Sequence, residues 1–257
     1  MRFAINKLTL TNFRNYVRMR LDITNKSIIL LGSNGVGKTN ILEALSLLIP
    51  GRGMRQTTLS TLIREGSSEG WAISADVVTP SGKLNIGTGY ALASITESRD
   101  RRVVKINGVQ QSNQSCLANH MGVIWLTPQM DRLFNDPPSA RRKFLDKLIG
   151  AWDPLHSGRI NAYNIKMRER LLILGSGTKI DLAWIAALES IMVEKGVAIS
   201  AARVEFLSRL APIASLGIDL FPGADMKLDG DLEFLIQSKP ALEVEDPYKR
   251  EKITKHI

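Results

Sequence analysis

The chain has 257 residues, of which 44% are hydrophobic and 23% charged, and 34 Lys and Arg against 25 Asp and Glu give a net charge of +9. This composition is that of a folded protein with one large or two modest cores. No apolar run approaches the roughly 18 to 20 residues that span a bilayer, and the N-terminus lacks a signal-peptide layout, so the sequence predicts a cytoplasmic protein without a membrane anchor.

The numbers of cysteines and histidines and the net charge limit which disulfides, metal sites and binding partners the chain can have. The chain has one cysteine, Cys116, which excludes an internal disulfide and is interpreted as a small buried hydrophobic residue. The three histidines are too scattered to indicate a metal site. The basic excess favours a polyanionic partner, nucleic acid before membrane.

The first half of the chain predicts mainly strands. Mixed β-branched and apolar residues, in partial alternation or in short apolar runs, predict strands at residues 2–13, 16–24, 27–31, 71–78, 83–92, 101–108 and 122–126. The run at 27–31 is continuously apolar, so we expect it to be buried on both faces. Asn107-Gly108 predicts a tight turn.

The second half predicts helices. After two prolines, a helix is expected to begin near Ser139, and the chain reads as mostly helical to about Leu210. One apolar stripe has helical spacing and consists of Ile160, Tyr163, Met167, Leu171 and Leu174. A second long helix is expected to start near Asp181 as N-cap, with residues 175–178 as the link. This pattern predicts an antiparallel helical pair beside an α/β body.

Residues 32–39, GSNGVGKT, match the phosphate-binding loop pattern G-x-x-x-x-G-K-[ST]. A predicted strand precedes the loop and a helix starting near Lys38 follows it, which is the context that the pattern requires. The loop glycines allow backbone angles that side chains forbid, so consecutive N–H groups can surround phosphate oxygens. The candidate nucleotide-binding residues are Gly32, Ser33, Asn34, Gly35, Val36, Gly37, Lys38 and Thr39.

Two side chains of this loop are expected to act on the phosphates and their metal. Lys38 reaches the β- and γ-phosphates as a point charge, and the Thr39 hydroxyl ligates the Mg²⁺ that bridges them. The competing interpretation is a glycine-rich turn with a chance lysine, which the agreement of strand, loop and helix disfavours. The sequence therefore predicts binding of a nucleoside triphosphate.

Five blocks carry a family resemblance, in order along nearly the whole chain: LTLTNFRNY at 8–16, GSNGVGKTNILEAL at 32–45, DRLFNDPPSARRKFLDKLI at 131–149, YNIKMRERLLIL at 163–174 and EKGVAISAAR at 194–203. Together they resemble the RecF family of DNA replication and repair proteins. The TNILEA extension is typical of the wider group that includes the SMC proteins, whereas PPSARRKFLD is specific to RecF.

The resemblance implies an α/β fold, namely an incomplete P-loop ABC-ATPase head with an N-terminal β-rich part and a helical second lobe. We divide the chain into a P-loop lobe (1–135), a helical lobe (136–215) and the start of a return to the head (216–257). The resemblance implies ATP and Mg²⁺ as cofactors and an ATP-dependent homodimer. It also implies binding to single-stranded and double-stranded DNA, recombinase loading at gaps with RecR-like and RecO-like mediators, and a part in the SOS response.

The sequence departs from that family in its last part. No signature loop of the STGEQK type occurs, and no apolar strand ends in the paired acidic residues of a Walker B element. We therefore expect a truncated relative that does not hydrolyse ATP at a useful rate and aggregates when alone, because the Walker B strand that would pair near residues 27–31 is missing. Catalytic residues stay unassigned.

Further candidate residues are weaker. Contact with DNA is expected first from Arg141, Arg142 and Lys143. A second basic group consists of Arg99, Arg101, Arg102 and Lys105. This second group could be either a DNA contact or a solvated face. Gln129 lies where cassette proteins place a glutamine that senses the γ-phosphate, although RecF proteins more often have an acidic residue there. Arg14 is either a candidate for the nucleotide site or a plain charge at the end of a strand.

Two other function classes stay open. A P-loop small-molecule kinase would need an acidic or arginine-rich substrate lid near the loop. Residues 50–66 offer Arg52, Arg55 and Arg64 but no clear lid pattern. The other class is a binding-only remnant without an ATPase cycle.

Overall fold

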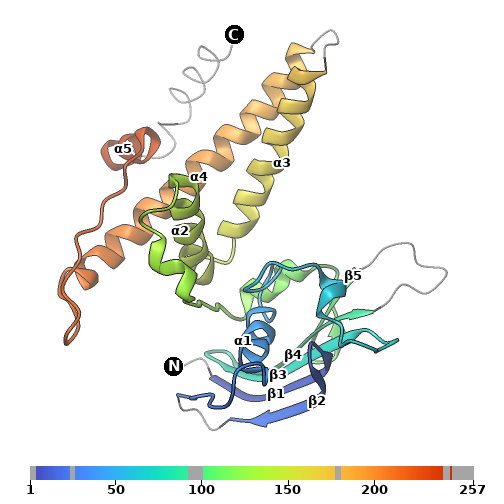
Figure 1. The fold of residues 1–257 in the computed structure, drawn as a ribbon. Coiled ribbons are helices and arrows are strands. Elements are labelled where there is room, and N and C mark those ends of the chain that lie inside the picture. Colours follow the sequence, from blue (N-terminus) through green and yellow to red (C-terminus); the bar gives the residue numbers. More distant parts are fainter. Residues whose placement is uncertain (1–3, 24–26, 92–100, 177–180, 240–243, 245–257) are drawn as a thin grey trace. The chain divides into compact units, whose positions relative to one another are not determined.

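The computed structural model describes residues 4–23, 27–91, 101–176, 181–239 and 244. They fall into two compact units, residues 1–130 and 131–257, each of which is described by itself (Figure 1). The predicted link at 175–178 lies partly, and the C-terminal stretch 245–257 wholly, outside the described residues.

The first unit is built on an antiparallel sheet of six described strands in the order β2-β1-β3-β4-β5-β6. Their bounds are β1 (Ala4–Phe13), β2 (Tyr16–Asp22), β3 (Trp71–Thr79), β4 (Gly82–Ala91), β5 (Arg101–Ile106) and β6 (Val109–Gln110). The predicted turn joins β5 to β6, with φ of 50° at Asn107 and 81° at Gly108, angles that Asn and Gly tolerate best. Five of the predicted strands are thereby confirmed, and β6 was too short for its alternation to be read.

Alternation along the strands gives the sheet one apolar face. In β3 the side chains of Trp71, Ile73, Ala75 and Val77 are all buried, while their neighbours are not. Helix α1 (Lys38–Ser46) lies against the sheet and, with the residues after it, contributes Ala44, Leu47 and Leu48 to the same core (Figure 1).

The described residues of this unit also form the short 3-10 helices η1 (Leu59–Leu62) and η2 (Gln114–Asn119). A third, η3 (Pro128–Arg132), lies where the first unit ends and the second begins. Cys116 in η2 packs against the core but is only partly buried, so the expectation of a fully buried thiol is wrong.

Two predicted strands are absent. Residues 27–31 and 122–126 form no regular element, and several of their apolar side chains face solvent: Ile29 is 81%, Leu31 87% and Leu126 78% exposed. Leu30, Val123 and Trp125 are half-buried. An apolar run becomes a strand only when a neighbour supplies hydrogen-bond partners. No described strand pairs with either run, so the prediction of a strand buried on both faces at 27–31 is wrong for this chain.

The second unit is helical. Its described helices are α2 (Pro138–Trp152), α3 (His156–Gly175), α4 (Leu182–Ala214) and α5 (Asp231–Ser238). The predicted N-cap of α4 is confirmed, because Asp181 accepts the backbone N–H groups of Ala183 and Trp184. Within the part of the chain that the structure describes, no helix is both long and apolar enough to cross a membrane.

Helices α3 and α4 lie side by side as the predicted pair and are joined by an ion pair of 2.7 Å between Arg170 and Glu189 (Figure 1). The apolar stripe of α3 is only partly covered. Leu171 and Leu174, its last two members, are 57% and 39% exposed. Spacing therefore located the helix but overstated how much of the stripe is buried.

A polar network inside the second unit joins α2, α3, α4 and α5. Asp146 accepts hydrogen bonds from Arg203 and pairs with the fully buried ring of His156, while Arg203 and Ser200 also bind Glu233. Burial by itself would raise the pKa of Asp146, but the hydrogen bonds from His156 and Arg203 hold it below its ordinary value. The network fixes the four helices to one another with complementary charges.

Candidate nucleotide-binding site

The loop at 32–39 has the backbone geometry that its glycines predict. The φ angles are 150° at Gly32, 87° at Gly35 and 110° at Gly37, and α1 begins directly afterwards at Lys38. Residues 32–36 are exposed, so a ligand can reach them. The first N–H groups of a helix have no partner within the helix and carry a partial positive charge, which makes this end of α1 suitable for an anion.

The lysine of the loop is already held within it. The Nζ of Lys38 donates to the backbone oxygens of Gly32 at 2.6 Å and Ser33 at 2.8 Å. Both acceptors are carbonyl groups, so the loop's N–H groups stay available for phosphate oxygens. The geometry places one full positive charge beside the dipole of α1.

Thr39 is the residue that would hold a metal ion. It is exposed in the first turn of α1, next to Lys38. Among the described residues, no group of three or more His, Cys, Asp or Glu side chains could hold a metal by itself. Thr39 stays the residue that the sequence predicts as a ligand of Mg²⁺, and its exposed position leaves the hydroxyl open to a ligand.

The turn between β1 and β2 forms one wall of the loop. Asn15 donates to the backbone oxygen of Val36 at 3.0 Å and accepts from Asn40 at 2.9 Å. A Cβ atom at Gly37 would lie 2.6 Å from the Tyr16 hydroxyl and 2.7 Å from the Asn15 amide. Gly37 is therefore required both for its positive φ and for this close approach.

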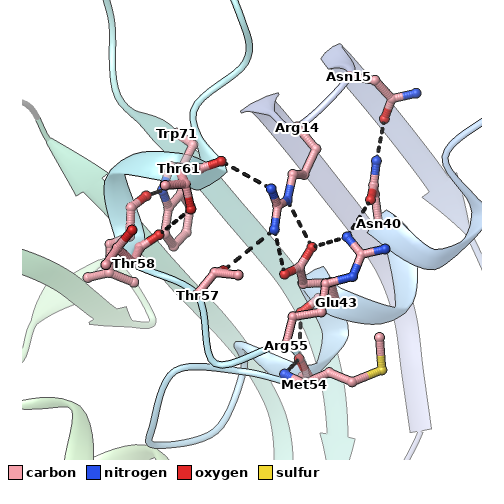
Figure 2. A network of polar contacts seen from close by, with 12 residues as sticks. Arg14, Asn15, Asn40, Glu43, Met54, Arg55, Thr57, Thr58, Thr61 and Trp71 are labelled. Atoms are coloured by element: carbon pink, nitrogen blue, oxygen red, sulfur yellow. Dashed lines mark hydrogen bonds and ion pairs between the residues drawn. The ribbon is translucent and has the colours of Figure 1, made fainter. Parts of the chain in front are cut away.

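A buried carboxylate lies beside this wall. Glu43 of α1 is 1% exposed and is bound by two arginines, with Arg14 at 2.9 Å through both Nε and Nη2 and Arg55 at 3.0 Å through Nη1 (Figure 2). Arg14 also donates to the backbone oxygen of Thr61 at 3.1 Å. Sequence reasoning missed Glu43, although a single acidic residue among the apolar positions of ILEALSLL was a usable signal.

This cluster bears on two earlier interpretations. Arg14, a candidate nucleotide contact, faces Glu43, and Arg55, a candidate lid residue, binds Glu43 and Asn40. Arg52 is exposed and Arg64 is half-buried. Residues 50–66 therefore do not form an arginine-rich substrate lid. This disfavours the interpretation of the chain as a small-molecule kinase.

Arg102 is a structural residue. Its guanidinium donates to the backbone oxygens of Leu47, Ile49 and Gly51, the residues that follow α1, so it caps the end of this helix. Burial lowers the pKa of Arg102 to about 10, which leaves it cationic at neutral pH. The expectation of a DNA contact or solvated charge is wrong at this position, while Arg99 and the side chain of Arg101 lie outside the described residues.

We expect Arg102→Ala to lower the free energy of unfolding by about 2–3 kcal/mol, because its charge-assisted hydrogen bonds to three backbone oxygens, including that of the buried Leu47, are lost. Lys105→Ala is the matched control, since Lys105 lies on the same strand and is exposed. Urea unfolding of both variants measures the difference. Equal midpoints would contradict the capping role.

The remaining predicted residues lie apart from the loop. Gln129 is exposed in η3, and the hydrogen bonds of the described residues do not join it to residues 32–39. In the second unit, Arg141 donates to the backbone oxygens of Phe134 and Asp136. Arg142 and Lys143 are exposed in the second turn of α2 and are available to a partner.

A phosphate-loop helix on an antiparallel sheet, followed by a helical pair, defines an α/β head of the ABC-ATPase class. The family model described as the RecF/RecN/SMC N terminal domain matches residues 4–130. Two curated proteins named DNA replication and repair protein RecF are similar over most of this chain. The one from Mesorhizobium japonicum is 44% identical over 96% of this chain and 64% of its own length, and the one from Allorhizobium ampelinum is 38% identical over 95% and 65%.

A solved structure of the recombination mediator protein RecF with ATPrS, in the RecFOR pathway, has the same fold. Its TM-score is 0.74 at 24% identity, over 83% of this chain and 57% of that chain. The chain is therefore similar to RecF proteins over nearly its whole length. It spans 64–65% of the length of these curated relatives.

Proposed function

We propose that this chain binds ATP, with Mg²⁺, at residues 32–39. The observation that carries the proposal is the loop itself: three glycines at positive φ lead into α1, and the Lys38 ammonium is held inside the curve of the loop. Two solved RecF structures, one with ATPrS and one with ATP, support the choice of nucleotide.

Each residue has a separate part in the proposed binding. The N–H groups of the loop and of the first turn of α1 bind the phosphate oxygens, and Lys38 neutralises the β- and γ-phosphates. Mg²⁺ would supply the charge that bridges these two phosphates, with the Thr39 hydroxyl as a ligand. The exposure of residues 32–36 lets the nucleotide enter without opening the core.

The site is tested by titration of the chain with ATP, ADP and adenosine in the presence of Mg²⁺. We expect ATP and ADP to bind and adenosine not to bind, because the loop contacts phosphates alone. Binding of adenosine with the affinity of ATP would contradict a phosphate-based site.

We further propose that the chain acts on DNA in replication and recombinational repair, in the cytoplasm. The names of its relatives support this role, as do the net charge of +9 and the exposed Arg142 and Lys143. As a RecF relative, the chain is proposed to bind single-stranded and duplex DNA at gaps and to form an ATP-dependent homodimer. We also propose RecR-like and RecO-like partners and a part in the SOS response.

Replacing Arg142 and Lys143 together by alanine should weaken duplex binding and lower the slope of log affinity against log salt by about two, because each neutralised phosphate releases counterions. Lys83→Ala with Lys227→Ala is the control, since both lysines are exposed and the loss of charge is equal. Fluorescence anisotropy at several salt concentrations measures both slopes. Equal slopes in the two double variants would show that the start of α2 is only a solvated face.

A further inference from the structure

We propose that Arg14 is a positioning residue for nucleotide binding, which acts by clamping Glu43 of α1 to the β1–β2 turn. The inference rests on the proposed binding of ATP at residues 32–39. It assigns to Arg14 a role in placing the phosphate loop without contact with the phosphates.

The burial of Glu43 makes the clamp necessary. A carboxylate that is 1% exposed has lost its water and is stable as an anion only beside compensating charge. Arg14 supplies a bidentate pair, with 2.9 Å from Nε to Oε2 and 2.9 Å from Nη2 to Oε1. The Arg14 side chain is 21% exposed and that of Arg55 is 40% exposed, so Arg14 is the more enclosed partner.

The backbone of Arg14 is fixed as tightly as its side chain. Arg14 has a φ of 55°, and its N–H donates to the backbone oxygen of Leu62 at 2.8 Å. Its guanidinium also donates to the Thr61 backbone oxygen and, at 3.5 Å, to the Thr57 hydroxyl. With these bonds and the two to Glu43, the guanidinium is committed to protein acceptors and is not directed at a ligand.

The clamp reaches the phosphate loop through two short routes. Asn15, the next residue in the turn, donates to the Val36 backbone oxygen. It also accepts from Asn40 (Figure 2). Asn40 also accepts from Arg55, which binds Glu43 at 3.0 Å. Glu43 lies four residues after Thr39, so the clamp and the proposed metal ligand share one face of α1.

The consequence is a defined pattern of lost affinity. If the clamp opens, the wall formed by Asn15 and Tyr16 moves away from Gly37, and every phosphate bound by the loop is affected. We expect Arg14→Ala to weaken ATP, ADP and pyrophosphate by the same factor, about 10- to 100-fold. A direct γ-phosphate ligand would instead cost ATP much more than ADP.

The decisive comparison measures the effect of Arg14→Ala with and without its partner Glu43. In a Glu43→Gln background the buried charge is gone, so Arg14→Ala should cost at most about a third as much in log affinity as it does with Glu43 present. Arg14→Lys, which keeps the charge but not the bidentate geometry, should restore part of the affinity. Arg20→Ala is the control, because Arg20 on β2 forms its ion pair with the exposed Asp22; this variant should bind ATP normally.

All titrations are made well below the unfolding midpoint of each variant, and Lys38→Ala is included. A larger loss for ATP than for ADP, or an equal loss with and without Glu43, would overturn the clamp in favour of direct contact. Unchanged affinity in Arg14→Ala would overturn the positioning role altogether.

A readout without nucleotide separates this proposal from the proposed function. In the nucleotide-free protein, Arg14→Ala should speed amide hydrogen exchange at residues 36–40 by about tenfold, whereas Arg20→Ala should not. If the unmodified chain binds no ATP, the proposed function fails, but the rate of amide hydrogen exchange still tests whether Arg14 clamps Glu43. Unchanged exchange at residues 36–40 in Arg14→Ala would overturn the clamp. If Arg14→Ala does not fold, Arg14→Lys is held to the same two patterns with a smaller effect.

Discussion

Lys38→Ala is expected to abolish measurable ATP binding and to leave the fold intact. The lysine is the full positive charge inside the loop, and its removal should cost at least about 100-fold in affinity, or about 3 kcal/mol. Its two acceptors, the backbone oxygens of Gly32 and Ser33, belong to exposed residues that water can reach. The free energy of unfolding should therefore change by less than about 1 kcal/mol.

A titration with a fluorescent ATP analogue measures this loss, and thermal unfolding checks the fold. Lys83→Ala is the matched control, because Lys83 is an exposed lysine on β4. Retention of ATP affinity in Lys38→Ala would contradict the phosphate-loop interpretation, and loss of affinity in Lys83→Ala would show that net charge alone decides binding.

Phe13→Ala should be the most destabilising single change in the first unit. Phe13 is 0% exposed and meets Trp71 edge to face, with ring centroids 5.6 Å apart. Removal of a fully buried aromatic ring costs about 3–5 kcal/mol, through lost transfer free energy and the cavity that is left. This would consume a large part of the stability of a domain of this size.

Val17→Ala provides the comparison, because Val17 is a nearby apolar residue that is 60% exposed. Its effect should stay within about 0.5 kcal/mol. Urea unfolding followed by tryptophan fluorescence measures both midpoints, and Trp71 is one of the four tryptophans that contribute to the signal. A Phe13→Ala midpoint equal to that of Val17→Ala would show that the β1–β3 contact is not part of the core.

Local patterns account for the parts of the fold that were predicted. Alternation over β3 and the Asn107-Gly108 turn depend on neighbouring residues, and both are confirmed. The same holds for the N-cap at Asp181 and for the start of α1 at Lys38. The phosphate loop was readable because its spacing encodes backbone angles directly.

Long-range pairing accounts for the misses. Glu43 and its partner Arg14 are 29 residues apart, and Arg102 binds backbone oxygens 51 to 55 positions away, which no local pattern reveals. The run at 27–31 has the composition of a buried strand, yet a strand also needs a hydrogen-bonded neighbour, which composition does not specify. Charge runs are ambiguous for the same reason, since a basic residue can bind phosphate or a helix end equally well.

The most direct test of the account is amide hydrogen exchange of the chain with and without ATP and Mg²⁺, followed by mass spectrometry. Binding at the phosphate loop should protect the N–H groups of residues 33–39, and Lys38→Ala should remove that protection. Protection in another part of the chain, or none at a saturating concentration of ATP, would contradict the assignment of residues 32–39 as the nucleotide site.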